Sequence, residues 1–65
     1  MEGWVAVYCC DQIFKAELAR QHLANNDLMA MVVNKKDSFY VTIGDVEVYV
    51  AQEDVEMATD LLKDF

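Results

Sequence analysis

The strongest constraint on the fold of this chain lies in its C-terminal third, where the period of the hydrophobic residues changes. Three valines alternate with Glu47 and Tyr49 and therefore lie on one face of a predicted strand: Val46, Val48 and Val50. Beyond Ala51 and Gln52, apolar side chains recur at three- and four-residue steps, the spacing of a helix: Val55, Ala58, Leu62 and Phe65. A strand that leads directly into a helix predicts a domain in which helices pack on a sheet.

The N-terminal half of the chain predicts a strand, a helix and a second strand. Residues 4–8 form an apolar run rich in aromatic and β-branched residues, which is typical of a strand. Residues 12–25 follow as a helix with Asp11 as its N-cap and with one apolar stripe: Ile13, Ala16, Ala19 and Leu23. The helix ends at a polar triplet suited to a chain break: Asn25, Asn26 and Asp27. Residues 28–33 are apolar and too few for a free-standing helix, which favours a strand.

Residues 34–45 allow two arrangements. In the first, Gly44 and Asp45 form a two-residue turn that joins a short extra strand, residues 40–43, to the strand at residues 46–50. In the second, the whole segment is a long connection between two strands. Both arrangements stay open at this point.

The element order is strand, helix, strand, strand, helix, and a chain of 65 residues can bury only one core. Because crossover connections are right-handed, the first two strands are expected to be parallel, with the last strand antiparallel between them. Both helices then cover one face of a three-stranded sheet. The expected fold class is a two-layer α+β sandwich, one domain spanning residues 1–65.

Strand alternation also predicts which side chains lie on the uncovered face of that sheet. If Val5, Val7 and Cys9 point to the helices, the residues that point away are Trp4, Ala6, Tyr8 and Tyr49. An aromatic patch of this kind indicates binding of a protein partner or self-association, for example as a dimer. The alternative is a register shifted by one residue, which would place the aromatic side chains in the core.

The charge balance excludes two classes of partner. Twelve acidic residues against five Lys and Arg give a net charge of -7, which repels phosphate backbones and anionic membrane surfaces. Nucleic acid is therefore not an expected partner, even though aromatic residues on a sheet can stack bases. No apolar run approaches the roughly 20 residues of a membrane span, and no signal-type start is present. We expect a cytoplasmic protein.

Cys9 and Cys10 are adjacent, so a disulfide between them would be strained. Both precede a predicted helix, a position in which thiols are often reactive, and a thiol-based redox or metal sensor is the alternative function. A buried thiol at Cys9 and a loop residue at Cys10 is the simpler interpretation. Together with His22 these residues cannot supply the four ligands of a closed zinc site, so no metal is expected.

No residue pattern indicates an enzyme or a cofactor. His22 is the only histidine and Ser38 the only serine, so a nucleophilic triad has no support, and His22 is expected to cap its helix or lie on the surface. With only two glycines, the chain has no phosphate-binding loop. Acidic residues line the solvent side of the last helix: Glu53, Asp54, Glu56, Asp60 and Asp64. Lys35 and Lys36 form a small basic spot, suited to an anionic ligand or to a solubilising turn.

The chain resembles the family of putative prokaryotic signal-transducing proteins over nearly its whole length. Besides a first strand that ends in Tyr8, the segments that carry the resemblance are residues 14–18 (FKAEL), 33–40 (VNKKDSFY) and 44–50 (GDVEVYV). Two positions depart from the family pattern: Ala51 replaces a frequent proline, and Asp27 replaces a frequent glycine at the end of the first helix. Both departures affect helix capping and leave the fold unchanged.

This resemblance implies a small bacterial βαββα domain, ferredoxin-like and distantly similar to nitrogen-regulatory signal-transduction proteins. It implies no catalytic residues, and the nucleotide-binding loop of the nitrogen regulators has no counterpart here. The expected function is a non-enzymatic regulatory, signal-transducing or protein-interaction module. Its expected interaction surface is Trp4, Tyr8 and Tyr49, with Lys35 and Lys36 in the neighbouring loop.

Overall fold

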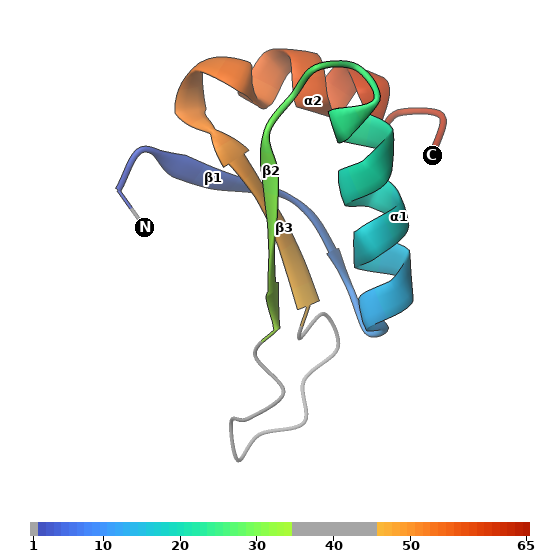
Figure 1. Cartoon of the computed structure of the whole chain (residues 1–65). Coiled ribbons are helices and arrows are strands. Elements are labelled where there is room, and N and C mark those ends of the chain that lie inside the picture. Colours follow the sequence, from blue (N-terminus) through green and yellow to red (C-terminus); the bar gives the residue numbers. More distant parts are fainter. Residues whose placement is uncertain (1, 35–45) are drawn as a thin grey trace.

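The computed structural model describes residues 2–34 and 46–65 and shows a βαββα order of elements (Figure 1). Its elements are β1 (Trp4–Cys10), α1 (Ile13–Ala24), β2 (Ala30–Asn34), β3 (Val46–Ala51) and α2 (Val55–Leu61), with a short 3-10 helix, η1 (Gln52–Asp54), between β3 and α2. The predicted α+β class is confirmed. The predictions for Lys35, Lys36 and residues 40–43 concern positions that lie outside the described residues.

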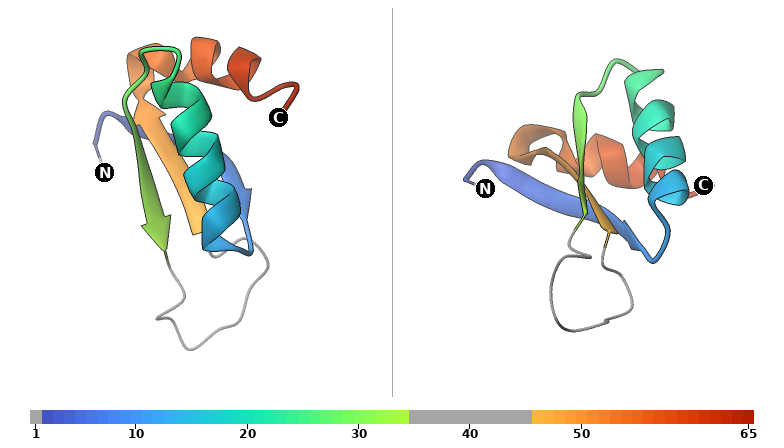
Figure 2. Two further views of the ribbon diagram at one scale, coloured as in Figure 1. Left: turned by 45° about the vertical axis from the view of Figure 1, so that its right-hand side comes forward. Right: turned by 60° about the horizontal axis from the view of Figure 1, so that its bottom comes forward.

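The three strands form one sheet in the order β1-β3-β2, and β3 runs antiparallel to both neighbours. β1 and β2 are therefore parallel to each other, joined through α1, as the handedness argument predicts. Two views at different angles show the helices α1 and α2 packed on the sheet (Figure 2). The predicted topology is confirmed.

The core lies between one face of the sheet and the two helices. Three fully buried valines of β3 meet fully buried residues of both helices: Val46, Val48, Val50, Ala16, Ala19, Leu23 and Ala58. Because alanines occupy most of the helix side of this interface, the helix backbones can approach the sheet closely. Both helices thus cover the same face of β3, as expected from the alternation of its valines.

A β-bulge in β1 overturns part of the predicted alternation. Ala6 pairs with Tyr49 and Tyr8 pairs with Val48, so β1 has one more residue than β3 at this point, Val7. An extra residue reverses the alternation beyond it. The prediction that Tyr8 lies on the uncovered face and Cys9 faces the helices is therefore wrong, because Tyr8 packs against the core and Cys9 is exposed.

The helix ends also differ from the sequence prediction. The N-cap of α1 is Gln12 and forms no side-chain cap bond, so the prediction of an Asp11 cap is wrong. Ile13, expected in the buried stripe, is 48% exposed. Phe65 lies beyond the end of α2, but its ring makes an edge contact with Tyr8, with 5.6 Å between ring centroids.

The C-terminus of α1 forms a Schellman motif. The Leu28 amide donates to the Leu23 carbonyl (3.0 Å) and the Asp27 amide donates to the Ala24 carbonyl (3.0 Å). Asp27 has a φ of 65°, the left-handed conformation that favours glycine. Leu23 and Leu28 are both buried, which supplies the hydrophobic contact that accompanies this motif.

Replacing Asp27 by glycine is expected to raise the free energy of unfolding by about 1 kcal/mol. The β-carbon is strained in the left-handed conformation, and the aspartate places a negative charge at the negative end of the α1 dipole. Urea denaturation followed by circular dichroism measures the change. The matched control is Asn25→Gly, because Asn25 is right-handed (φ −65°) and should lose stability instead. Equal changes in the free energy of unfolding for the two variants would contradict the assignment of strain to Asp27.

Candidate interaction surface

The face of the sheet opposite the helices is the candidate site, here called the open face. Strand register assigns its members, because directly paired residues of neighbouring strands share a face. They are Trp4, Ala6 and Cys9 of β1, Met31 and Val33 of β2, and Glu47, Tyr49 and Ala51 of β3. Within the described ranges, α1 and α2 both pack on the other face.

Tyr49 stands at the centre of this face. It is paired with Ala6 on one side and with Met31 on the other, so its neighbours across the sheet are one small and one flexible apolar residue. Its hydroxyl donates a hydrogen bond to a carboxylate oxygen of Glu47, 3.1 Å away and two residues earlier on the same strand. This bond restrains the ring and partly satisfies the carboxylate at the surface.

The open face is apolar and only partly shielded. Met31 is 41% exposed, while Trp4, Val33 and Tyr49 are half-buried. Glu47 is the only charged member of the open face among the residues that the structure describes. Aromatic and methionine side chains in such a setting are the residue types enriched in protein interfaces.

Of the three predicted aromatic members, the structure brings Trp4 and Tyr49 to the open face and removes Tyr8. The Tyr8 ring lies on the helix side, against Phe65. Met31 and Val33 belong to the open face and were not predicted. The alternation within residues 30–34 could have indicated them once β2 was known to pair with β3.

His22 connects the two helices. Its Nε2 atom lies 2.9 Å from the Leu61 carbonyl oxygen and, because a carbonyl can only accept, Nε2 is the donor. The ring of His22 also lies 5.8 Å from that of Phe65. A capping role was predicted, but the helix end that His22 caps is that of α2, 39 residues away in sequence, which no local pattern indicates.

The two cysteines point to different environments, and both are free thiols. Cys9 is exposed on the open face beside Glu47, whereas Cys10 is half-buried and its Sγ donates to the Gln12 carbonyl (3.0 Å). Across residues 2–34 and 46–65, no three side chains of His, Cys, Asp or Glu cluster as they would around a metal ion. The structure adds no support for a cysteine sensor.

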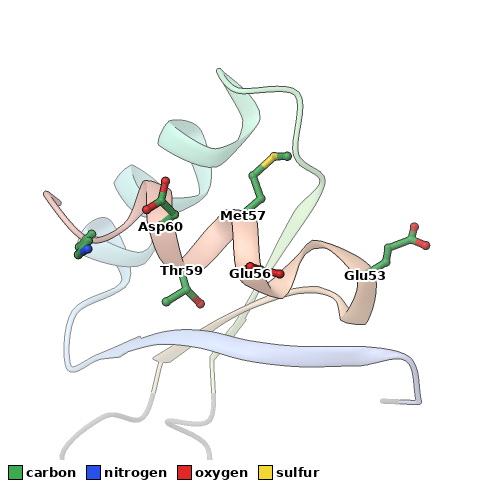
Figure 3. A pocket seen from close by; sticks show the side chains of 6 residues that line it. Glu53, Glu56, Met57, Thr59 and Asp60 are labelled. Carbon is green, nitrogen blue, oxygen red and sulfur yellow. The ribbon is translucent and has the colours of Figure 1, made fainter.

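The acidic side chains of the last helix line a shallow hollow rather than a convergent site. Its lining is Glu53, Glu56, Met57, Thr59, Asp60 and Lys63. The labelled side chains point in different directions, with Met57 directed away from Thr59 (Figure 3). Such an arrangement fits a solvated acidic face.

A second exposed apolar feature lies on α1, directly opposite its buried stripe. Phe14 is 58% exposed and Leu18 is 51% exposed, and they are one helical turn apart. This pair was not predicted, because the buried stripe already accounted for the apolar spacing of the helix. The four-residue spacing of Phe14 and Leu18 was the available signal.

Comparison with known proteins identifies a family and no individual relative. None of the helices in the described segments is both long and apolar enough to traverse a bilayer. Neither the curated proteins nor the solved structures contain a match to this sequence. The family model described as "putative prokaryotic signal transducing protein" matches residues 4–65. With a match over almost its entire length, the chain belongs to the family of putative prokaryotic signal transducing proteins.

Proposed function

We propose that this chain is a non-enzymatic, cytoplasmic regulatory module that works by binding a protein partner on its open face. The observation that carries this proposal is the apolar open face itself, on which Trp4, Met31 and Tyr49 lie without a covering helix among the described residues. A partner that covers large apolar side chains on a sheet face removes them from water, and this burial favours binding.

The charge distribution indicates the chemistry of the partner. The chain carries a net charge of -7, yet the open face contributes one described acid, Glu47. The acids of α2 lie on the other layer of the sandwich. The partner is therefore expected to present an apolar patch surrounded by Lys and Arg, because long-range attraction then speeds the encounter while the apolar contact holds the complex.

Replacing Tyr49 by glutamate tests this proposal. The variant places a charge at the centre of the open face and removes the aromatic contact, so partner affinity is expected to fall at least tenfold. The matched control is Gln21→Glu, which adds the same charge at an exposed position of α1. Native protein coupled to a resin identifies bound proteins, and the purified partner is then titrated against wild type and both variants by calorimetry.

Two native side chains report directly on the open face during that titration. Trp4 is the only tryptophan, so its emission changes when a partner covers this face. Cys9 is exposed on the same face, so its alkylation slows in the complex, whereas Cys10 serves as the internal comparison. Equal affinities of wild type and Tyr49→Glu, or an unchanged Trp4 emission in the complex, would remove the basis of the proposal.

A further inference from the structure

β2 is one of the two edge strands of this sheet. In the order β1-β3-β2 it has a neighbouring strand on one side only, within the described part of the chain (Figure 2). Its residues, Ala30–Asn34, pair with β3 without a bulge and include no charged side chain and no proline. Proteins usually protect an edge strand with one of these features, because an open edge can pair with another chain.

The opposite edge, β1, is different. The bulge at Val7 interrupts the regular spacing of its backbone groups. A bulged strand pairs poorly with an added strand because its twist and spacing no longer match. Strand addition to this sheet is therefore favoured at β2.

We propose that β2 pairs antiparallel with β2 of a second copy of this chain around a two-fold axis at Met31. This pairing would join two sheets into one six-stranded sheet with a continuous open face. The pairing uses the backbone edge of β2, whereas partner binding uses the side chains of the open face. Met31 belongs to both surfaces, so its variants are judged here by self-association and not by partner binding.

The side chains beside β2 support a second copy as the occupant. Met29, directly before β2, is 73% exposed, and Met31 is 41% exposed. With the axis at Met31, the central pairs across the two strands are apolar: Met31 faces its own copy, Met29 faces Val33, and Ala30 faces Val32, while Asn34 faces Leu28 at the end of the strand. A shift of the axis to Val32 would leave the exposed Met29 without an apolar residue opposite it, so the chosen register covers more exposed apolar surface.

The distribution of charge permits this self-pairing. β2 is uncharged, and the acids of α2 lie on a helix that packs against β1 and β3. Each copy still carries a net charge of -7, so the two copies repel each other over the distance that salt does not screen. The dimer should therefore be weak at low ionic strength and should strengthen as salt is added.

The size of the contact also predicts a weak complex. Two five-residue strands extend about 17 Å each, and their contact is smaller than the roughly 1,200 Å² of a stable interface. Self-association is therefore expected only at high protein concentration. Sedimentation velocity over a concentration series, at about 0.05 M and 0.5 M salt, should show a monomer that becomes a dimer more readily in the higher salt.

Met31→Lys tests the surface. It places two positive charges opposite each other at the axis, so the dissociation constant of the dimer is expected to rise at least tenfold. The matched control, Gln21→Lys, makes the same charge change on the exposed side of α1 and should leave dimerisation no weaker than in the wild type. A strict monomer at all concentrations in both salts, or equal effects of the two lysines, would overturn the proposal.

Two variants, each with a single cysteine, test the register. In a chain carrying Cys9→Ser and Cys10→Ser, Met31→Cys should form a disulfide-linked dimer under mild oxidation, because residues paired at the axis lie about 5 Å apart. Met29→Cys in the same background should not, since its copies lie about 14 Å apart in this register. Faster cross-linking at position 29 than at position 31 would overturn the pairing. So would an NMR dilution series of the wild type in which only the amide signals of α1 shift with protein concentration.

Discussion

Leu23→Ala is expected to lower the free energy of unfolding by about 3 kcal/mol. Leu23 is fully buried and is the largest helix residue in the core, where it meets the valines of β3. The alanine leaves a cavity that the packed sheet and helices cannot fill. A domain of this length has a total stability of only about 3 to 10 kcal/mol, so this one substitution removes a large part of it.

Leu23 also takes part in the Schellman motif that ends α1. Its carbonyl accepts from the Asn26 and Leu28 amides, and its side chain is buried together with that of Leu28. Truncation therefore weakens the helix end as well as the core. Urea denaturation measures the loss, and Leu23→Met, which preserves the volume, should lose less than about 1.5 kcal/mol and keeps the test interpretable if the alanine variant does not fold.

The control for this prediction is an exposed leucine of the same helix, Leu18. Leu18→Ala makes the same chemical change at a side chain that is 51% exposed, and it should change stability by about 0.5 kcal/mol or less. Similar losses at positions 18 and 23 would show that helix propensity, and not burial, accounts for the effect.

Ala19→Leu is expected to lower the free energy of unfolding by about 2 kcal/mol by overpacking the core. Ala19 is fully buried between α1 and the sheet, as is Ala16 one turn earlier. A leucine needs space that exists only if the helix moves away from β3, which separates the valines from their partners on both helices.

Ala24→Leu separates overpacking from helix propensity. Ala24 is the exposed last residue of α1, so a leucine there should leave stability within about 0.5 kcal/mol of the wild type. Urea denaturation of both variants decides the question. A neutral Ala19→Leu variant would mean that the helix is not held close to the sheet by its alanines.

The layout of the fold was predictable from local pattern and handedness. The valines of β3 and the apolar stripes of the helices show their periods directly, and a right-handed crossover leaves room for β3 between β1 and β2, where the structure places it. Part of the open face followed from this reasoning, because Trp4, Ala6 and Tyr49 lie where alternation places them.

The remaining features depend on contacts between distant segments. The bulge at Val7 reverses the faces of Tyr8 and Cys9, and a strand of apolar residues contains no period that marks one extra residue. His22 caps α2 across 39 residues of sequence. Such contacts form only after the helices have packed, so local sequence patterns cannot predict them.

The sequence by itself determined the strand-to-helix unit of residues 46–65. A hydrophobic period of two residues requires an extended backbone, and a period of three to four residues requires a helical one. The sequence also determined which face of β3 enters the core. Only the tertiary structure decided that Tyr8 belongs to the helix side and that Met31 and Val33 join Tyr49 on the open face. The physical reason is that strand pairing sets register, and one residue of register exchanges the two faces of a strand.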